Sequence, residues 1–507
     1  MRDFRIVRTL MIIPICLLLL PVGVHPTEAQ EETMDLKTLK RDMDELRRRD
    51  AENRKTIEQL MRKIEQFEDR ETQAKPKPPT ALEKAVVEAE AEPAPVEPSR
   101  PALLSTQLGS GTTLRLIDVS LDVLAAAGSS SAGDEIIQLL QGGGHDPRQR
   151  GFTLQQAELG LSGAVDPYVN AQAYFVFNID PEGETQLELE EAFLTTQALP
   201  AGLQLKAGFY QTEFGRINPQ HPHQWRWQDQ PFINTRFFGG DALRQTGVRL
   251  GWLMPLPFFS ELLVGVQQPR GETMVSFLGN DEVFEERPIG GRPFVDRSIE
   301  RISDLAWSFR WSGFTDLSPE VSGLLGFSAA LGPNATGDDG YTYIYGTDLT
   351  LKWRPTTHFR GWPFVEWQTE VMKRDYKAAT FAGENEDGDP ITIPQATLRD
   401  WGLYTQLLYG FTYRWAAGAR FEYGTGRGDN VDEDGDFVSR NTDPFRSDRY
   451  RISPMLLFHP TEFLRLRLQY SYDHADFLKE QFNRSKDAHS VWMGVEFSLG
   501  AHPAHTY

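Results

Sequence analysis

The sequence contains one cysteine among its 507 residues, Cys16, and this residue lies inside an N-terminal segment with the pattern of an export signal. Three arginines among the first eight residues, an apolar run over 10–20 and a small-residue exit near Ala29 predict a signal peptide over 1–29. The apolar run is too short to anchor the chain in a bilayer. A mature chain without thiols has neither a disulfide nor a cysteine-based metal site.

Long apolar stretches are also lacking after the signal segment, and the mean hydropathy is -0.44, so no transmembrane helix is expected. Positive charge is scarce: the net charge is -20 and the isoelectric point is about 5.0, which argues against nucleic acid as a partner. There is no Gly-x-Ser-x-Gly elbow, no His-Glu-x-x-His and no phosphate-binding glycine loop followed by Lys-Ser/Thr. We therefore expect neither an enzyme nor a cofactor.

What the sequence does contain is a repeated two-residue alternation. In the segment 463–472, Leu464, Leu466 and Leu468 alternate with Arg465 and Arg467. Period-2 alternation indicates a strand with one apolar face. A soluble barrel of this size would have an apolar interior, so charges that recur on the other face in many segments favour a water-filled lumen inside a membrane-spanning barrel.

Sixteen such segments separated by alternating short and long connections predict an all-β, transmembrane, antiparallel up-and-down β-barrel over 113–507. Both ends then lie on the short-turn side, which requires an even number of strands; fourteen and eighteen are the alternatives to sixteen. The expected strands are 113–125, 152–164, 168–178, 187–198, 202–212, 243–253, 258–267, 302–313, 320–331, 341–354, 362–373, 399–409, 414–424, 448–458, 463–474 and 488–499.

A different pattern, apolar residues at alternating spacings of three and four, predicts a coiled-coil helix over 34–70. Asp50 and Asn53 interrupt its core, and a single amphipathic helix on the barrel rim is the alternative. The Pro/Ala/Glu-rich segment 71–112 is expected to be a linker, because it has too few apolar residues to fold alone. The core positions are Leu36, Leu39, Met43, Leu46, Ile57, Leu60, Ile64 and Phe67.

The predicted lumen side chains are unevenly charged. A basic wall is expected on the strands near the C-terminus, from Arg420, Arg449, Arg451, Arg465 and Arg467. Other expected lumen residues are Lys206, Arg249, Arg310, Asp348, Lys352, Glu366 and Glu370. Carboxylates facing the basic wall would set up a transverse field that separates cations from anions; the alternative is that these charges only hydrate the lumen.

Three motifs carry a family resemblance: Gly208-Phe-Tyr-Gln-Thr-Glu-Phe-Gly215, Asp229-Gln-Pro-Phe-Ile233 and Thr246-Gly-Val-Arg-Leu-Gly251. Together with the signal peptide, coiled coil, acidic linker and sixteen-stranded plan, they resemble the phosphate-selective porin O/P family. The resemblance implies a trimeric outer-membrane porin. One long loop of such barrels folds inward to narrow the pore, and 213–242 and 268–301 are the two candidates.

Two motifs suggest metal binding. His221-Pro-His223 supplies too few convergent ligands for a full site, so a structural loop is favoured there. An acidic stretch resembles the first half of a calcium loop, but Asn441 stands where the bidentate glutamate belongs. Acidic loop tips bridged to lipopolysaccharide through divalent ions are an equal alternative, so no metal is expected, with one weak candidate calcium loop at Asn430, Asp432, Asp434 and Asp436.

These patterns predict a homotrimeric porin in the outer membrane of a Gram-negative bacterium, with the coiled coil in the periplasm. Small anionic or neutral solutes would diffuse through it, with an anion preference set by the basic wall, and outer-membrane lipid and lipopolysaccharide would surround it. Two alternatives remain open. One is an envelope-tethering protein whose coiled coil reaches the cell wall, and the other is a substrate-specific uptake channel for phosphate or another anion.

Overall fold

The computed structural model describes residues 105–107, 113–115, 117–180, 183–385 and 388–500. The predicted signal peptide and the coiled coil over 34–70 lie outside the described residues, and so does most of the predicted linker.

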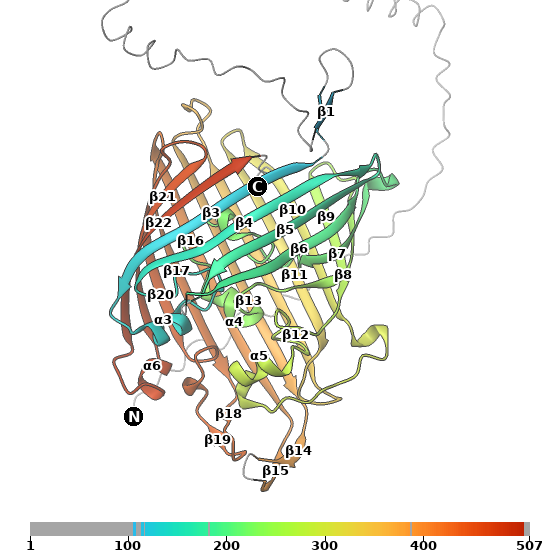
Figure 1. Ribbon diagram of the computed structural model, residues 1–507, viewed down its shortest axis with the longest axis vertical. Helices are drawn as coiled ribbons and strands as arrows, with labels where there is room; N and C mark the ends of the chain where they lie inside the picture. Colours follow the sequence, from blue (N-terminus) through green and yellow to red (C-terminus); the bar gives the residue numbers. More distant parts are fainter. Residues whose placement is uncertain (1–104, 108–112, 116, 181–182, 386–387, 501–507) are drawn as a thin grey trace, which may run out of the picture. The chain divides into compact units, whose positions relative to one another are not determined.

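Sixteen antiparallel strands form one closed barrel (Figure 1). Each strand pairs with the next along the chain, and the last strand pairs with the first to close the ring. The prediction of sixteen strands is therefore confirmed. The barrel strands are β3 (Asp118–Ser130), β4 (Gly151–Asp166), β5 (Val169–Ile179), β6 (Thr185–Thr196), β7 (Leu203–Gln211), β8 (Arg244–Leu253), β9 (Phe259–Gln267), β10 (Ala306–Ser318), β11 (Val321–Pro333), β12 (Tyr341–Trp353), β13 (Phe364–Ala378), β16 (Ala396–Thr412), β17 (Trp415–Arg427), β20 (Arg449–Phe458), β21 (Leu464–Ala475) and β22 (Asp487–Gly500).

Alternating side chains separate the inner from the outer face of the barrel wall. In β21, Arg465, Arg467 and Gln469 are buried, whereas Leu468 and Tyr470 are 50% and 39% exposed. Because successive side chains of a strand point to opposite faces, the apolar set lies outside and the polar set inside. This arrangement is inverted relative to a soluble barrel and is the one expected for an outer face that contacts lipid.

Aromatic rings mark both rims of the outer face. Trp415 stacks on Phe458 near the short turns, and Tyr423 packs against Trp401 toward the other rim. Tyr423 follows Trp415 by eight positions along β17. This offset corresponds to a height of about 20 Å for a strand tilted by about 40°. This height is close to the apolar band of about 25 Å that such barrels present to the bilayer.

Two predicted strand starts were wrong by four or five residues, and the ends predicted at 125, 313 and 373 each fall five residues short of those of β3, β10 and β13. The strand expected to begin at 113 begins at Asp118, and β2 (Thr113–Arg115) pairs instead with β1 (Ser105–Gln107). The strand expected from 302 begins at Ala306 because η4 (Ile302–Asp304) forms a turn before it. The Asp304 carboxylate accepts the backbone N–H groups of Glu300 and Arg301, which stabilises that turn over an extended strand.

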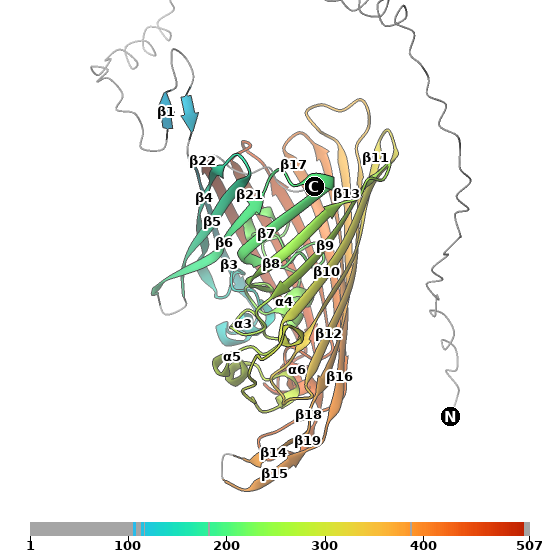
Figure 2. The same ribbon diagram turned by 90° about the vertical axis from the view of Figure 1, so that its right-hand side faces the viewer.

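The long connections carry the remaining elements, and both views place these at the end opposite the short turns or inside the barrel (Figures 1 and 2). They are α3 (Asp134–Leu140), η2 (Pro222–Gln224), α4 (Phe232–Phe238), α5 (Asp281–Glu286), η3 (Ile289–Gly291), β14 (Phe381–Glu384), β15 (Pro390–Ile393), β18 (Asn430–Val431), β19 (Phe437–Val438), η5 (Arg440–Thr442) and α6 (Phe477–Glu480). A short 3-10 turn, η1 (Pro200–Gly202), lies at the other rim. None of the helices in the described part of the chain is long and apolar enough to cross a membrane.

Candidate functional site

The lumen is crossed by the connection between β7 and β8, residues 212–243, which we call the strap. Its helix α4 is buried along its whole length. A hydrophobic cluster joins the strap to the next long connection and to strands of the wall. Its members are Phe214, Ile217, Ile233, Phe237, Phe238, Leu243, Met274, Phe277, Ala306, Ala330, Ile344, Met372 and Tyr404. The strap is therefore held by apolar packing, which polar pore walls alone do not supply.

Two strap residues of opposite charge meet neighbouring parts of the barrel wall, β13 on one hand and β17 with β20 on the other, and β16 lies between β13 and β17. Nη2 of Arg226 lies 3.0 Å from Oε2 of Glu366 on β13. Three residues further along the strap, Asp229 accepts from Nη2 of Arg420 at 2.5 Å and from Nη1 of Arg451 at 2.8 Å. The strap thus neutralises part of the charge on both parts of the wall. Glu366 was expected to face the basic wall across the lumen, but β13 is two strands from β17, so the expectation of an acidic side opposite the arginines is wrong.

All five arginines of the predicted basic wall are buried inside the barrel. Arg449 and Arg451 both donate to the carbonyl oxygen of Leu140, at the end of α3, and Arg465 donates to the carbonyl of His223 at 2.6 Å. The structure therefore brings the predicted wall together, and it shows that loops pack on it. The carboxylates that pair with the wall are Asp229, Glu422, Asp473 and Glu496.

The other predicted lumen residues also face inward; Glu370 is held by hydrogen bonds and the rest form ion pairs. Arg310 pairs with Asp348 at 2.8 Å, and Lys352 lies 3.4 Å from Glu366. Glu370 accepts the backbone N–H of the strap residue Arg216 at 3.2 Å.

Lys206 and Arg249 lie apart from this group and converge on the strap residue Glu213, each at 3.2 Å. Burial raises the pKa of Glu213, but these two cations lower it more, and the net pKa lies below its ordinary value. In the same way, burial raises the pKa of Asp229, and Arg420 and Arg451 bring it below its ordinary value. Both strap carboxylates therefore stay ionised at neutral pH and hold the strap electrostatically.

Cavities lie on the two sides of the strap. A cavity of about 240 Å³ on the short-turn side is bordered by Lys352, Glu366 and Arg465, and a cavity of about 470 Å³ on the long-loop side is bordered by Arg148 and Arg287. A small cavity of about 10 Å³, lined largely by strap residues, shares lining residues with both. A cavity of this volume holds about one water molecule. We call this narrow part of the lumen, between the two larger cavities, the constriction.

The second candidate loop lies on the strap. Phe277, in the connection between β9 and β10, belongs to the hydrophobic cluster around α4, and the hydroxyl of Ser276 donates to the carbonyl of Phe237 at 2.5 Å. Arg287 donates to the carbonyl of Thr235 at 3.1 Å. Both predicted loops therefore fold inward, the strap across the lumen and the other loop against it.

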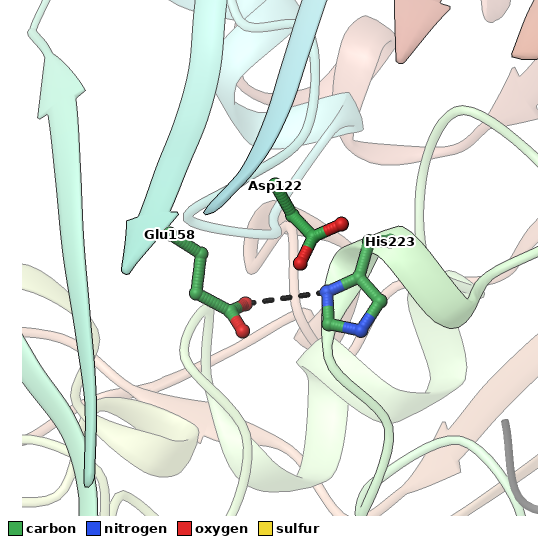
Figure 3. A group of neighbouring side chains, drawn as sticks. All are labelled: Asp122, Glu158 and His223. Carbon is green, nitrogen blue, oxygen red and sulfur yellow. Dashed lines mark ion pairs between the residues drawn. The ribbon is translucent and has the colours of Figure 1, made fainter. Parts of the chain in front are cut away.

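The sequence prediction missed the surroundings of His221 and His223. Nδ1 of His221 lies 3.1 Å from Oε2 of Glu158 and 3.0 Å from Oε2 of Glu190, and its Nε2 lies 2.9 Å from Oε2 of Glu191. His223 lies beside Glu158 and Asp122 (Figure 3). The four carboxylates come from β3, β4 and β6, so the ligands that the sequence motif lacked are supplied by the wall.

A β-bulge in β6 explains how two neighbouring carboxylates reach this cluster. The register passes from Tyr174 opposite Glu191 to Phe175 opposite Leu189, which leaves Glu190 as the extra residue. A bulge lets consecutive side chains point to one face, and Glu190 and Glu191 are both buried inside the barrel. The sequence signal was the break in alternation at Glu188-Leu-Glu-Glu191.

The weak calcium candidate forms a hairpin turn between β18 and β19. The Asp432 side chain accepts the backbone N–H of Asp436 at 2.8 Å, and Asp434 is exposed. The groups of converging ligand atoms found in the described part of the chain do not include this turn.

Fold and interior together define a closed sixteen-stranded antiparallel barrel with an apolar outer face and an ionised lumen crossed by a strap. The chain belongs to the same family as a protein of Aquifex aeolicus (strain VF5) described as uncharacterized, with which it shares 32% identity over 391 residues, 74% of this chain and 75% of that protein. No family model matches the sequence.

Similar solved structures are barrels with low sequence identity to this chain. They include the outer membrane channel DcaP of Acinetobacter baumannii, with 11% identity, 76% of this chain and 97% of that chain covered and a TM-score of 0.46. OprB of Pseudomonas putida has 11% identity, 76% and 94% coverage and a TM-score of 0.44. An anion-selective porin from Comamonas acidovorans has 8% identity, 76% and 99% coverage and a TM-score of 0.44.

Proposed function

We propose that the protein is an outer-membrane porin through which small hydrophilic solutes diffuse. The observation that carries the proposal is the reversed polarity of a closed barrel: Leu468 and Met493 on the outside are half exposed, while Arg467 and Glu496 are inside. An apolar exterior requires lipid to cover it, and closure satisfies the backbone hydrogen bonds that lipid cannot. Ionised groups inside require water, which makes the lumen a path for polar solutes.

Planar-bilayer recording of the purified full chain tests this proposal. A porin inserts and gives stepwise current increases in salt solution. Because the strap narrows the lumen, the steps are expected to be small and to grow when the strap is loosened. An absence of steps from correctly folded protein, for both the native chain and a strap variant, would reject the porin and favour the envelope-tethering alternative.

We further propose an anion preference set by the basic wall. Its five arginines face four carboxylates, Asp229, Glu422, Asp473 and Glu496, which leaves one positive charge in excess. A local excess of positive charge on the lumen wall attracts anions to that part of the lumen.

A charge series at Arg465 and Arg467 measures this preference. Replacing both by glutamine and then both by glutamate is expected to move the reversal potential in a salt gradient stepwise toward cations. The glutamine pair controls for loss of the hydrogen bonds to Glu496. An unchanged reversal potential in the glutamate pair would show that these side chains do not act on the permeation path.

The constriction favours a second candidate, a substrate-specific anion channel. The cavity of about 10 Å³ among the strap residues holds about one water molecule, so a larger solute that passes there would have to displace strap contacts. Millimolar phosphate in the bath distinguishes the two: a specific channel is blocked by it, and a general porin conducts as before.

We also propose a homotrimer. The support is the heptad pattern over 34–70, since a coiled coil brings chains together in a fixed number. Chemical cross-linking and mass measurement of the detergent-solubilised full chain are expected to give three chains per particle. A variant with Leu39→Asp and Leu60→Asp in the predicted seam should lower that number if the coiled coil drives assembly.

A further inference from the structure

We infer that Glu158, Glu190 and His221 bind a divalent metal ion of the zinc class between the strap and the barrel wall. The three side chains come from β4, from the bulge of β6 and from the strap next to η2. The inference does not depend on the proposed function, because it is drawn from the positions and charges of these side chains.

The donor atoms already converge on one point. Nδ1 of His221 lies 3.1 Å from Oε2 of Glu158 and 3.0 Å from Oε2 of Glu190, and the three ligand atoms all lie within 4.8 Å of one another. One N–H can serve two carboxylate oxygens only as a bifurcated hydrogen bond, in which neither contact is linear, whereas a metal ion can bond to all three atoms. Bonds of about 2.0–2.2 Å in a tetrahedral site place donors roughly 3.4 Å apart. The two distances from Nδ1 of His221 are therefore within about 0.4 Å of those that such a site requires.

The other nitrogen of His221 has the partner that a metal-bound histidine usually has. Nε2 of His221 lies 2.9 Å from Oε2 of Glu191. Histidine ligands commonly donate their second N–H to a carboxylate, which fixes the tautomer and the ring orientation. With Glu191 accepting at Nε2, the lone pair of Nδ1 is directed at Glu158 and Glu190, where the ion would lie.

Charge supplies a separate reason for a cation here. Glu158, Glu190 and Glu191 are each at most 5% exposed. Buried carboxylates need compensating charge, and within the described residues the ion-pair partners of Glu158 are two histidines, His221 and His223.

Nearby cations compensate only part of this charge. Lys206 lies 4.0 Å from Glu191 but closer to Glu213, and Arg244 lies 3.9 Å from Glu190 but closer to Glu188. A divalent ion would supply the charge that these shared cations do not.

Donor chemistry selects the class of ion. Imidazole nitrogen with carboxylate oxygen, and no sulfur, suits Zn²⁺ and related transition-metal ions better than Ca²⁺ or Mg²⁺, which prefer oxygen alone. Glu158 also faces Nδ1 of His223 at 3.3 Å, in a second group completed by Asp122 (Figure 3). Glu158 is therefore placed to bridge to a second ion.

Zinc at this site would tie the strap to β4 and β6 and so fix one side of the constriction. The direct test uses the full chain, folded in detergent, stripped with a chelator and titrated with Co²⁺ as a spectroscopic substitute and then with Zn²⁺. We expect one Zn²⁺ per chain, or two if the second group also binds an ion. Co²⁺ in a nitrogen–oxygen site of low coordination number should absorb visible light, and added Zn²⁺ should displace it and abolish this absorption.

Variants locate the ion. Glu190→Gln and His221→Gln are expected to weaken binding at least tenfold, whereas His489→Gln on the outer face is the matched control and should bind as the native chain does. Circular dichroism verifies that each variant is folded. Absence of stoichiometric binding to the folded native chain would overturn the proposal and leave His221 as a hydrogen-bonded link among carboxylates. Unchanged binding in folded Glu190→Gln and His221→Gln would also overturn it.

Discussion

At the scale of single residues, opposite charges three positions apart decide where the strap lies. Arg226 pairs with Glu366 on β13, and Asp229 pairs with Arg420 and Arg451 on β17 and β20. An ion pair inside a protein gives little net stability. Removing one partner leaves the other charge buried and unpaired, and this lowers the free energy of unfolding by about 3–5 kcal/mol. The pairs therefore act mainly to specify one position of the strap.

Asp229→Asn tests this role. The variant leaves Arg420 and Arg451 with one fewer counter-charge, so the free energy of unfolding is expected to fall by about 3 kcal/mol or more, and the reversal potential is expected to shift toward anions. Urea unfolding in detergent and bilayer recording measure the two effects. Asp434→Asn, in the exposed turn between β18 and β19, is the control. A variant that matches this control in both measurements would show that Asp229 does not neutralise the wall.

A pH effect is expected at His459, which lies in the short turn between β20 and β21 and borders the short-turn cavity. Burial, and then the charges of Arg465 and Arg226, lower its pKa from 6.5 to about 4. Between these two pH values the unfolded chain binds the proton and the folded chain does not, so acid favours unfolding.

The wild-type protein should therefore lose up to about 2 kcal/mol more than His459→Gln when the pH falls from 7 to 4.5. Urea midpoints of both proteins at the two pH values measure this difference. Equal losses in the two proteins would mean that His459 titrates in the folded state as it does in water.

At the scale of elements, the strap is anchored to the wall by one large ring as well as by charge. Trp227 is 1% exposed, packs in a cluster with Leu408, Met455 and Leu457, and donates its indole N–H to the carbonyl of Ser453 at 2.9 Å. Removing a buried tryptophan side chain costs about 3–5 kcal/mol.

Trp227→Ala is therefore expected to release the middle of the strap and to raise single-channel conductance. Trp401→Ala, at an exposed site on the outer face, is the matched control and should leave conductance unchanged. If Trp227→Ala also conducts as the native chain does, the strap is not the constriction.

Strands and strap differ in how far the sequence predicts them. The alternation of Leu464, Leu466 and Leu468 with arginines is local, and the same local rule located all sixteen strands. The strap depends on contacts between distant residues: Asp229 meets Arg451 across 222 positions, and His221 meets Glu158 across 63. The motif His221-Pro-His223 was visible in the sequence, but the positions of the carboxylates around it depend on the bulge in β6 and on the closure of the barrel.

At the scale of the whole molecule, the barrel depends on which face of each strand meets lipid. The side chains of β17 between the aromatic rims that point outward are Ala417, Ala419 and Phe421, all exposed. The inward side chains Arg420 and Glu422 are buried. A one-residue slip of register would exchange these faces and place charges in hydrocarbon, so the position of every strand follows from this polarity.

Site-directed spin labelling of β21 tests that polarity most directly. The chain has no cysteine after Cys16, so single cysteines at successive positions from 466 to 471 can each carry a label in protein reconstituted into lipid. Collision rates with oxygen, which concentrates in the bilayer, are expected to be high at Leu466, Leu468 and Tyr470 and low at Arg467, Gln469 and Ser471. A flat profile, or one with its maxima at the arginine and glutamine positions, would contradict the account.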